Sequence, residues 1–219
     1  MQRNSVSARA GTCRRIAGLA VLALSMLAAT GGAAADDPAV VGSTRKLSPT
    51  AGARLNGTER VLALGAEVHC DEQLWTGAKG RIEIALVDGG TVELGENARV
   101  VLDDFVLPKD GAASLVLRSV SGALRFVGGA IDHARPGAVR IVTPVATMVV
   151  RGTDFFAGPI DGAYGVFVFH GEVQVATSGG SVTLRDGEGT TITRSDAAPG
   201  AIKRWAAAKI GRAEKLVGF

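Results

Sequence analysis

One short phrase recurs three times in this chain: a glycine followed by alternating apolar and polar residues. Its copies are Gly80-Arg81-Ile82-Glu83-Ile84, Gly122-Ala123-Leu124-Arg125-Phe126 and Gly171-Glu172-Val173-Gln174-Val175. The outer two copies continue alike, through a glycine turn into a second alternating run. Alternation with a period of two is typical of β-strands, and self-similar units of this kind bury their apolar edges against their neighbours. The phrase predicts an all-β domain.

Many short alternating runs with glycine-rich turns between them continue this pattern from Arg60 to Thr193. Valine, isoleucine and leucine dominate the runs, and aromatic residues make up only 5% of the chain. Small branched side chains suit a narrow interior. We therefore expect a β-solenoid-like or flattened β-roll domain, with Val149, Val173 and Val182 in one shared interior.

The first 35 residues have the pattern of a secretory signal peptide. Four arginines and no acidic residue precede an apolar run, Ile16 to Ala29, and Ala33-Ala34-Ala35 offers a cleavage site after Ala35. The run is shorter than the roughly 20 residues that span a bilayer, although an uncleaved membrane anchor is the alternative. We expect a periplasmic or exported protein.

Removal of this segment changes the charge of the protein. The whole chain has 24 Lys and Arg against 21 Asp and Glu, and four of the basic residues lie in the signal. The remainder is close to neutral, which gives no reason to expect nucleic acid as a partner. Cys13 also leaves with the signal, so we expect Cys70 to remain as a lone, buried cysteine, with an intermolecular disulfide as the alternative.

The rest of the chain divides into three parts by composition. Residues 36–59 are polar, contain Pro and Gly and predict a flexible leader. Residues 60–195 predict the β domain. Residues 196–219 have the 3.6-residue period of an amphipathic helix, which either caps the end of the β domain or binds a partner or a membrane surface. In the second case Lys203, Arg204 and Trp205 are candidate partner contacts.

Motifs of catalysis are not found in the sequence. It has no nucleophile elbow, no phosphate-binding glycine loop and no dinucleotide fingerprint. His69-Cys70-Asp71-Glu72 places four potential metal ligands side by side, but neighbouring residues of a strand point to opposite faces. We therefore predict a protein that is not an enzyme and needs no metal or other cofactor.

The longest specific stretch is Ile141 to Phe155, and with it the chain resembles the FecR domain family. It contains a Thr-Pro step, alternating apolar residues and then Val-x-Gly-Thr-x-Phe. Elements similar to the family lie on either side of it, in the family's order. The residues that match are Thr76, Gly77, Asp88, Gly89, Thr143, Pro144, Gly152, Thr153, Phe155, Gly171 and Val173.

Physical arguments give several of these residues structural roles. Pro144 lacks a backbone N–H and is expected at a strand edge or corner. Gly152 with Thr153 predicts a tight turn between strands, which the side chain of Phe155 would seal from inside. A ligand cleft at this corner is the alternative.

The resemblance implies a β-solenoid-like module that lies outside the cytoplasmic membrane and works by contact. The best-known members are transmembrane anti-sigma regulators, which receive a signal from an outer-membrane transporter. This chain has no helical domain before its apolar segment, so we expect a stand-alone secreted member. Its function would be protein–protein contact with an unknown envelope protein, in signalling or scaffolding. Binding of a glycan or another surface polymer is the alternative.

Overall fold

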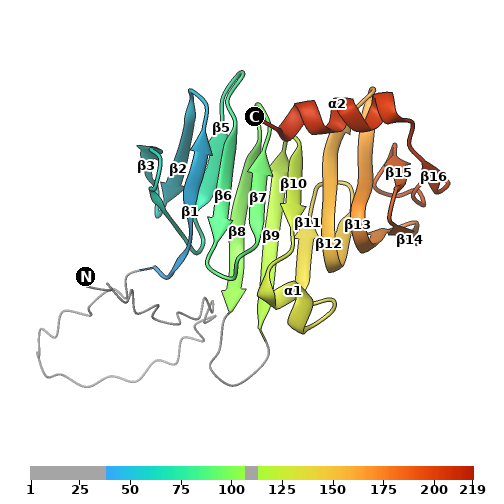
Figure 1. Ribbon diagram of the computed structural model, residues 1–219, viewed down its shortest axis with the longest axis horizontal. Helices are drawn as coiled ribbons and strands as arrows, with labels where there is room; N and C mark the ends of the chain where they lie inside the picture. The colour runs from blue at the N-terminus through green and yellow to red at the C-terminus, as the bar shows by residue number, and fades with distance from the viewer. Residues whose placement is uncertain (1–37, 107–112) are drawn as a thin grey trace, which may run out of the picture.

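The computed structural model describes residues 38–106 and 113–219, so the expected signal peptide and its cleavage site lie outside the described residues. The described residues form one 16-stranded sheet and two helices (Figure 1). The expected all-β fold with a C-terminal helix is confirmed. In chain order the elements are β1 (Val40–Leu47), β2 (Ala51–Leu55), β3 (Thr58–Val61), β4 (Glu67–His69), β5 (Gln73–Thr76), β6 (Ile82–Leu86), β7 (Thr91–Leu94), β8 (Arg99–Val106), β9 (Ser114–Ser121), β10 (Leu124–Val127), α1 (Ala130–Ala134), β11 (Val139–Val142), β12 (Thr147–Ile160), β13 (Ala163–Thr177), β14 (Gly180–Arg185), β15 (Glu188–Ile192), β16 (Lys203–Arg204) and α2 (Ala207–Val217).

The sheet has two branches that meet at the long strand β12. The first branch has the order β3-β2-β5-β8-β9-β11, and β11 pairs with the first half of β12. The second branch has the order β4-β1-β6-β7-β10, and β10 pairs with the second half of β12. The next strand, β13, pairs along the whole of β12 and then with β15 and β14. The hairpin β12–β13 therefore joins the two branches.

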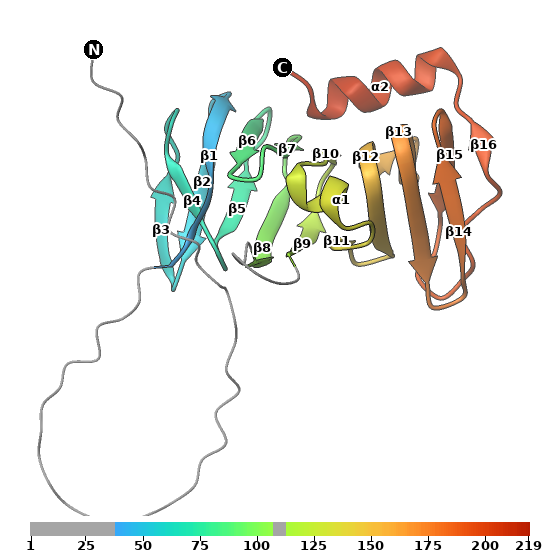
Figure 2. The same cartoon turned by 60° about the horizontal axis from the view of Figure 1, so that its bottom comes forward.

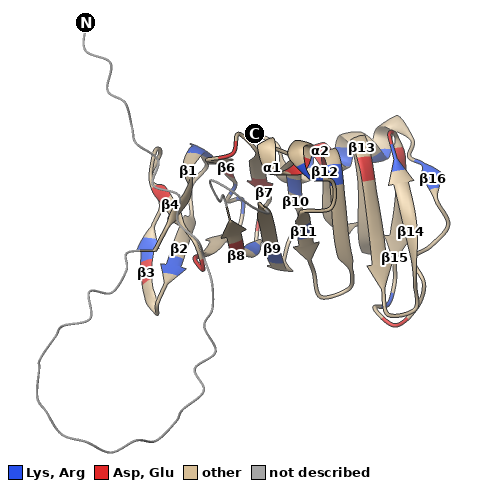
Figure 3. Cartoon of the chain, turned by 90° about the horizontal axis from the view of Figure 1, so that it is seen from below, with Lys and Arg blue, Asp and Glu red and all other residues tan. Residues whose placement is uncertain are grey.

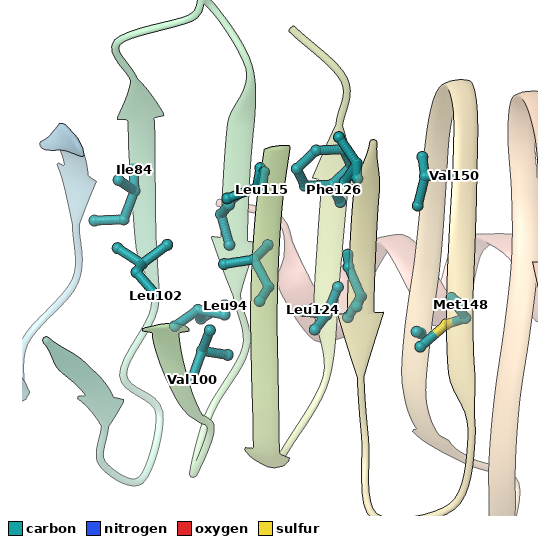
Figure 4. Close-up of a cluster of buried hydrophobic side chains, with 14 of the residues drawn as sticks. Ile84, Leu94, Val100, Leu102, Leu115, Leu124, Phe126, Met148 and Val150 are labelled. Atoms are coloured by element: carbon teal, nitrogen blue, oxygen red, sulfur yellow. The ribbon is translucent and has the colours of Figure 1, made fainter. Parts of the chain in front are cut away.

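One apolar core is shared by the two branches. Side chains of the second branch, such as Ile84 and Phe126, point into the same space as Leu102 and Leu115 of the first branch (Figure 4). All four side chains are buried. Because each strand alternates, its apolar residues reach this interior while its polar residues stay on the outer face. This agreement between pattern and burial explains why the strands form where the sequence predicts them.

The pairing differs from that of a regular stack of coils. Among the described strands, β9 and β11 pair in parallel, and the other pairs are antiparallel. The sheet curls but stays open at its ends (Figures 1 and 2). A curled open sheet is thus the description that the strand pairing supports.

The repeated phrase forms strands in all three places, in β6, β10 and the second half of β13. The two outer copies do continue through a glycine turn, into β7 and β14 respectively. Val173 lies in the shared core and Val182 packs against it. Val149 is on the outer face instead, because it pairs with the exposed Gln174 while its neighbours Met148 and Val150 are buried.

The prediction of a flexible leader over residues 36–59 is wrong for most of that segment. Strand β1 lies between β4 and β6, and Val41 is only 1% exposed. Strand β2 lies between β3 and β5. The local pattern is weak because glycines and charged residues interrupt it, so long-range pairing determines these strands.

The C-terminal helix is shorter than the predicted 196–219. Helix α2 begins at Ala207, and Lys203–Arg204 form the short strand β16 beside β15. The first part of the helical period is therefore used as an extended segment, whose pairing with the sheet overrides its local preference. None of the helices among the described residues is long and apolar enough to cross a lipid bilayer.

The expectation for Cys70 is half right. Its side chain is buried, with 3% exposed, as expected for a small apolar residue. It is not a free thiol, however. The expectation of a lone cysteine rested on the loss of Cys13 with the signal segment.

Candidate interaction site

The Gly152 corner is a bend within two paired strands and not the predicted turn between strands. Gly152 and Gly171 both have positive φ, +60° and +90°, and the register of β12 and β13 shifts between Arg151 and Asp154. A Cβ atom on Gly171 would overlap the carbonyl oxygen of Gly152. The two glycines therefore let the hairpin pass from one branch of the sheet to the other. As predicted, Phe155 is fully buried directly after this bend.

Two carboxylates fix helix α1 in place: Asp132 ties it to the bend, and Asp88 ties it to the turn between β6 and β7. Asp132, which is 1% exposed, accepts a hydrogen bond of 2.9 Å from the Thr153 backbone N–H. Asp88 accepts from the Ile131 N–H at 3.3 Å and from the Gly90 N–H at 3.0 Å. Gly89, with φ of +86°, forms the turn that presents Asp88. The motif residues Asp88, Gly89 and Thr153 thus meet at α1 and are occupied by backbone contacts.

Thr76 and Gly77 lie in a second, separate place. The Thr76 hydroxyl donates to the Gly95 carbonyl at 2.6 Å and accepts from the Ala98 N–H at 2.9 Å. The Gly77 N–H donates to the Thr50 carbonyl at 2.8 Å. These bonds join the ends of β2, β5 and β8. Gly77 therefore ties β5 to β2, and Thr76 ties β5 both to β8 and to the end of β7 in the second branch.

Thr143 and Pro144 lie in a third place, at the turn between β11 and β12, as predicted for Pro144. The Thr143 hydroxyl donates to the Ala146 carbonyl at 2.8 Å and accepts from the Ala146 N–H at 3.0 Å. The turn forms one wall of a shallow depression of about 350 Å³. Hydroxyl and small apolar residues line it: Thr143, Pro144, Val145, Ala146, Thr147, Ala176, Thr177, Ser178 and Ser195.

The Trp205 side chain is partly buried against other residues of this chain. Its ring stacks on Phe167, with centroids 5.0 Å apart and planes at 24°. The ring also lies against Gly165 and Gly189, where any Cβ atom would collide with it. Lys209 lies 4.2 Å from the ring centroid. Trp205 therefore anchors the start of α2 to the outer face of β13 and β15.

Helix α2 turns its apolar side toward the sheet and its charged side outward. Ala213 and Val217 are buried in a cluster with Ala123, Phe156 and Phe167 of the sheet. Arg212 forms an ion pair with Asp161 at 3.0 Å, which lowers the pKa of that carboxyl. Lys203 and Arg204 are exposed at the end of the sheet, where Figure 3 shows basic residues on β16. Of the three candidate contacts, these two are on the surface.

A row of charges crosses the outer face of the second branch beside α2. Lys46 lies 2.6 Å from Glu83, and Arg125 forms two hydrogen bonds with Asp154 at 2.8 and 2.7 Å. The bond to Asp154 raises the pKa of Arg125. Between the pairs, Glu93 lies opposite both Glu83 and Arg125. Burial raises the pKa of Glu93, and the attraction of Arg125 acts against this shift.

The four potential ligands of His69 to Glu72 do not converge. Glu72 is buried and accepts from Arg60 at 3.0 Å with both carboxylate oxygens. His69 lies 3.5 Å from Glu72, whereas Asp71 is exposed. Within residues 38–106 and 113–219, no three His, Cys, Asp or Glu side chains are placed to hold a metal ion.

Among the described residues, the large apolar side chains with the greatest exposure lie at the end of the first branch, and no sequence motif predicts them. Val61 is 82% exposed at the end of β3, and Leu64 is 68% exposed in the loop that follows. Strand β3 is the outermost strand of its branch (Figure 1). The alternating pattern marks Val61 as part of a strand and cannot show that the strand has no neighbour. This edge is the candidate interaction site.

Comparison with known proteins identifies the central part of the chain. Residues 72–174 match the model of the FecR family, described as FecR protein. No curated protein matches the chain in sequence.

Two crystal structures of a "putative anti-sigma factor" from Parabacteroides distasonis ATCC 8503, at 2.50 and 1.65 Å resolution, share the fold. Each has a TM-score of 0.51 and 18% sequence identity, over 64% of this chain. This chain spans 62% of the length of those chains. The motif residues, the family match and the fold agree, and residues 72–174 form a FecR domain.

Proposed function

We propose that the protein is a non-catalytic module that acts by protein–protein contact in signalling or scaffolding in the cell envelope. The observation that carries this proposal is the use of the FecR motif residues. The side-chain oxygens of Thr76, Asp88 and Thr143 all form hydrogen bonds with backbone groups of this chain, in turns, at strand ends and in α1. Such residues stabilise the fold, and contacts with a partner are made by other residues on the surface.

In this proposal the curled sheet is a rigid support for a docking surface. The FecR family match favours a regulatory role, and each of the two crystal structures of similar fold is described as that of a "putative anti-sigma factor". The arginine-rich apolar start of the chain supports export through a cleaved signal peptide. Amino-terminal sequencing of the protein from the periplasmic fraction tests this location, and the first residue expected is Asp36.

The contact itself is tested by recovery of a partner. The full chain, immobilised through a residue of the exposed side of α2, is incubated with envelope extract of the source cells. A protein that binds in stoichiometric amount, and that binds again as a purified component, is the expected result. Retention of polysaccharide in place of any protein would contradict the proposal.

Binding of a surface glycan is a second candidate because of the depression at Thr143 to Thr147. Its lining contains several hydroxyl groups, which suit a neutral polyol. Titration of the chain with envelope glycans, followed by NMR, should shift the amide signals of Thr147 and Ser178 if this candidate is right. Unchanged spectra at saturating glycan would exclude it.

A further inference from the structure

The backbone of β3 is open on one side at two residues. The Leu62 N–H donates to the Ala51 carbonyl, and hydrogen-bonded pairs alternate along an antiparallel ladder. The pairs 53–60 and 55–58 are therefore bonded as well, whereas Gly52–Val61 and Arg54–Glu59 are not. The Gly77 N–H donates to the Thr50 carbonyl, so by the same alternation residues 52 and 54 of β2 form their backbone hydrogen bonds with β5 and not with β3. Glu59 and Val61 thus direct their N–H and C=O groups away from the sheet.

An apolar row on the outer face leads to this open edge. Val61 pairs with Gly52, and Gly52 pairs with Trp75 on its other side. The Trp75 ring covers Gly52, where a Cβ atom would collide with it. The row therefore runs from Trp75 through Gly52 to Val61, and among the described residues no apolar side chain lies beyond Val61. An apolar side chain on an added strand would continue the row.

The other terminal strands have features that protect sheet edges. Strand β16 has two residues, both basic, and β4 has three, beginning with the exposed Glu67. Strand β14 presents Ser181 and Arg185 at its surface. Short length and charged or polar side chains discourage the addition of further strands. Among the described terminal strands, β3 has the most exposed large apolar side chain.

A second copy of the chain fits this edge poorly. An antiparallel copy that uses both open residues pairs Glu59 with Val61 of the second copy and places Arg60 opposite Arg60. The register centred on Glu59 places two carboxylates opposite each other. The register centred on Val61 needs the Ala63 carbonyl, which already accepts from the Ala66 N–H. Like charges directly opposite each other destabilise a strand pair, so a strand of different sequence is favoured.

We propose that the open edge of β3 receives an extended segment of another protein as an added strand, with a basic side chain opposite Glu59 and an apolar side chain opposite Val61. Main-chain hydrogen bonds from Glu59 and Val61 hold the segment, and the two side chains select it. This inference rests on the proposed function and names the surface and the kind of partner.

The test places a photo-cross-linking amino acid at position 61 of the full chain in the source cells, with Val87 as the control position. Val87 is 49% exposed and lies in the second branch, after β6. The cross-linked segment is identified by mass spectrometry and made as a peptide of about eight residues, a usual strand length. We expect an adduct with another protein from position 61 only. We also expect the amides of Glu59 and Val61 to become protected from hydrogen exchange when the purified chain binds the peptide.

Two pairs of variants separate the main-chain and side-chain parts of the contact. Val61→Pro removes an outward N–H that β2 does not use, and should weaken peptide binding at least about tenfold, whereas Val61→Thr keeps the N–H and should bind within about twofold. Glu59→Lys should weaken binding about threefold, and a peptide with Glu in place of its basic residue should restore it. Glu59→Gln is the neutral control. The charge exchange remains informative if Val61→Pro disturbs folding.

Several results would overturn the inference. They are an adduct only with residues 1–37 of the same chain, an adduct only with a second copy, and peptide binding without protection at Glu59 and Val61. A purified partner that binds the chain equally well with Glu59→Lys and Val61→Pro would leave the proposed function standing and refute this site. Absence of any protein partner would refute the proposed function itself.

Discussion

Replacement of Gly171 by alanine tests the bend that joins the two branches. Gly171 has φ of +90°, and a Cβ atom there would overlap the Gly152 carbonyl oxygen and lie 2.9 Å from the Arg151 carbonyl oxygen. Gly162, in the turn of the same hairpin, is the matched control. Its φ is +79°, and its Cβ position has no heavy atom within 4 Å.

The two substitutions differ in one physical effect. Alanine at positive φ costs about 1 kcal/mol of strain at either position. At Gly171 the methyl group also meets backbone atoms that cannot rotate away, and overpacking of this kind costs typically about 1–3 kcal/mol more. We therefore expect Gly162→Ala to lower the free energy of unfolding by about 1 kcal/mol, and Gly171→Ala by about 3 kcal/mol.

Urea denaturation of the full chain, followed by circular dichroism at neutral pH, measures both values. A loss of about 3 kcal/mol is a large part of the 5–15 kcal/mol of a typical domain, so the midpoints should be well separated. Amide exchange should show the added instability of Gly171→Ala on both sides of the bend, in β12 and β13. Equal losses for the two variants would refute the argument that close backbone contact, and not φ alone, requires glycine at position 171.

Three further predictions follow from single contacts. Trp205→Ala removes the ring from its site on Phe167, and should lower stability by about 2–3 kcal/mol and let the amides of α2 exchange before those of the sheet; unchanged exchange in α2 would contradict the anchoring role. Asp132→Ala leaves the buried Thr153 N–H without its acceptor and should cost about 1–3 kcal/mol in urea denaturation, whereas Asp132→Asn, which keeps an acceptor, should cost less. The folded state raises the pKa of Glu93 above 4.5, so it favours the protonated carboxyl, and this contribution to stability is present at low pH and lost as the pH rises through the folded pKa. Glu93→Gln should therefore be more stable than the wild type at pH 7, with an advantage that fades toward pH 4, while the exposed Glu59→Gln gives the baseline; a constant difference across this range would show the shift to be absent.

The sequence predicts the strands well where the two-residue alternation and the turn residues lie next to each other in the chain. The phrase beginning at Gly80 is one example, because its apolar residues Ile82 and Ile84 are the ones that the sheet buries. The sequence predicts the structure less well where pairing with a distant strand determines the conformation of a segment. Gly152 has the local character of a turn, yet it lies within β12 because a second glycine, Gly171, faces it from β13. Strand β1 was missed because β4 and β6, on either side of it, supply its pairing.

The candidate site could not be predicted from the sequence, because the exposure of a side chain depends on which strands lie beside its own in the folded sheet. Val61 belongs to an apolar pattern and would be buried in a central strand, but β3 ends its branch and leaves the side chain in solvent. Trp205 shows the opposite case. Its position next to Lys203 and Arg204 in the sequence makes it a candidate partner contact. In the structure its ring packs on the sheet at Gly165 and Gly189, where the absence of side chains leaves room for it.

By itself, the sequence determined the class of this protein: alternation and glycine turns specify β-strands, and the order of motif residues specifies a FecR domain. Those are properties of neighbouring residues, since the side-chain period and the φ preference act over a few positions. Only the tertiary structure decided the two branches, the bend that joins them, the place of α2 and the open edge of β3. Each depends on which distant strands pair, and pairing is governed by shared burial and backbone hydrogen bonds that no local pattern contains.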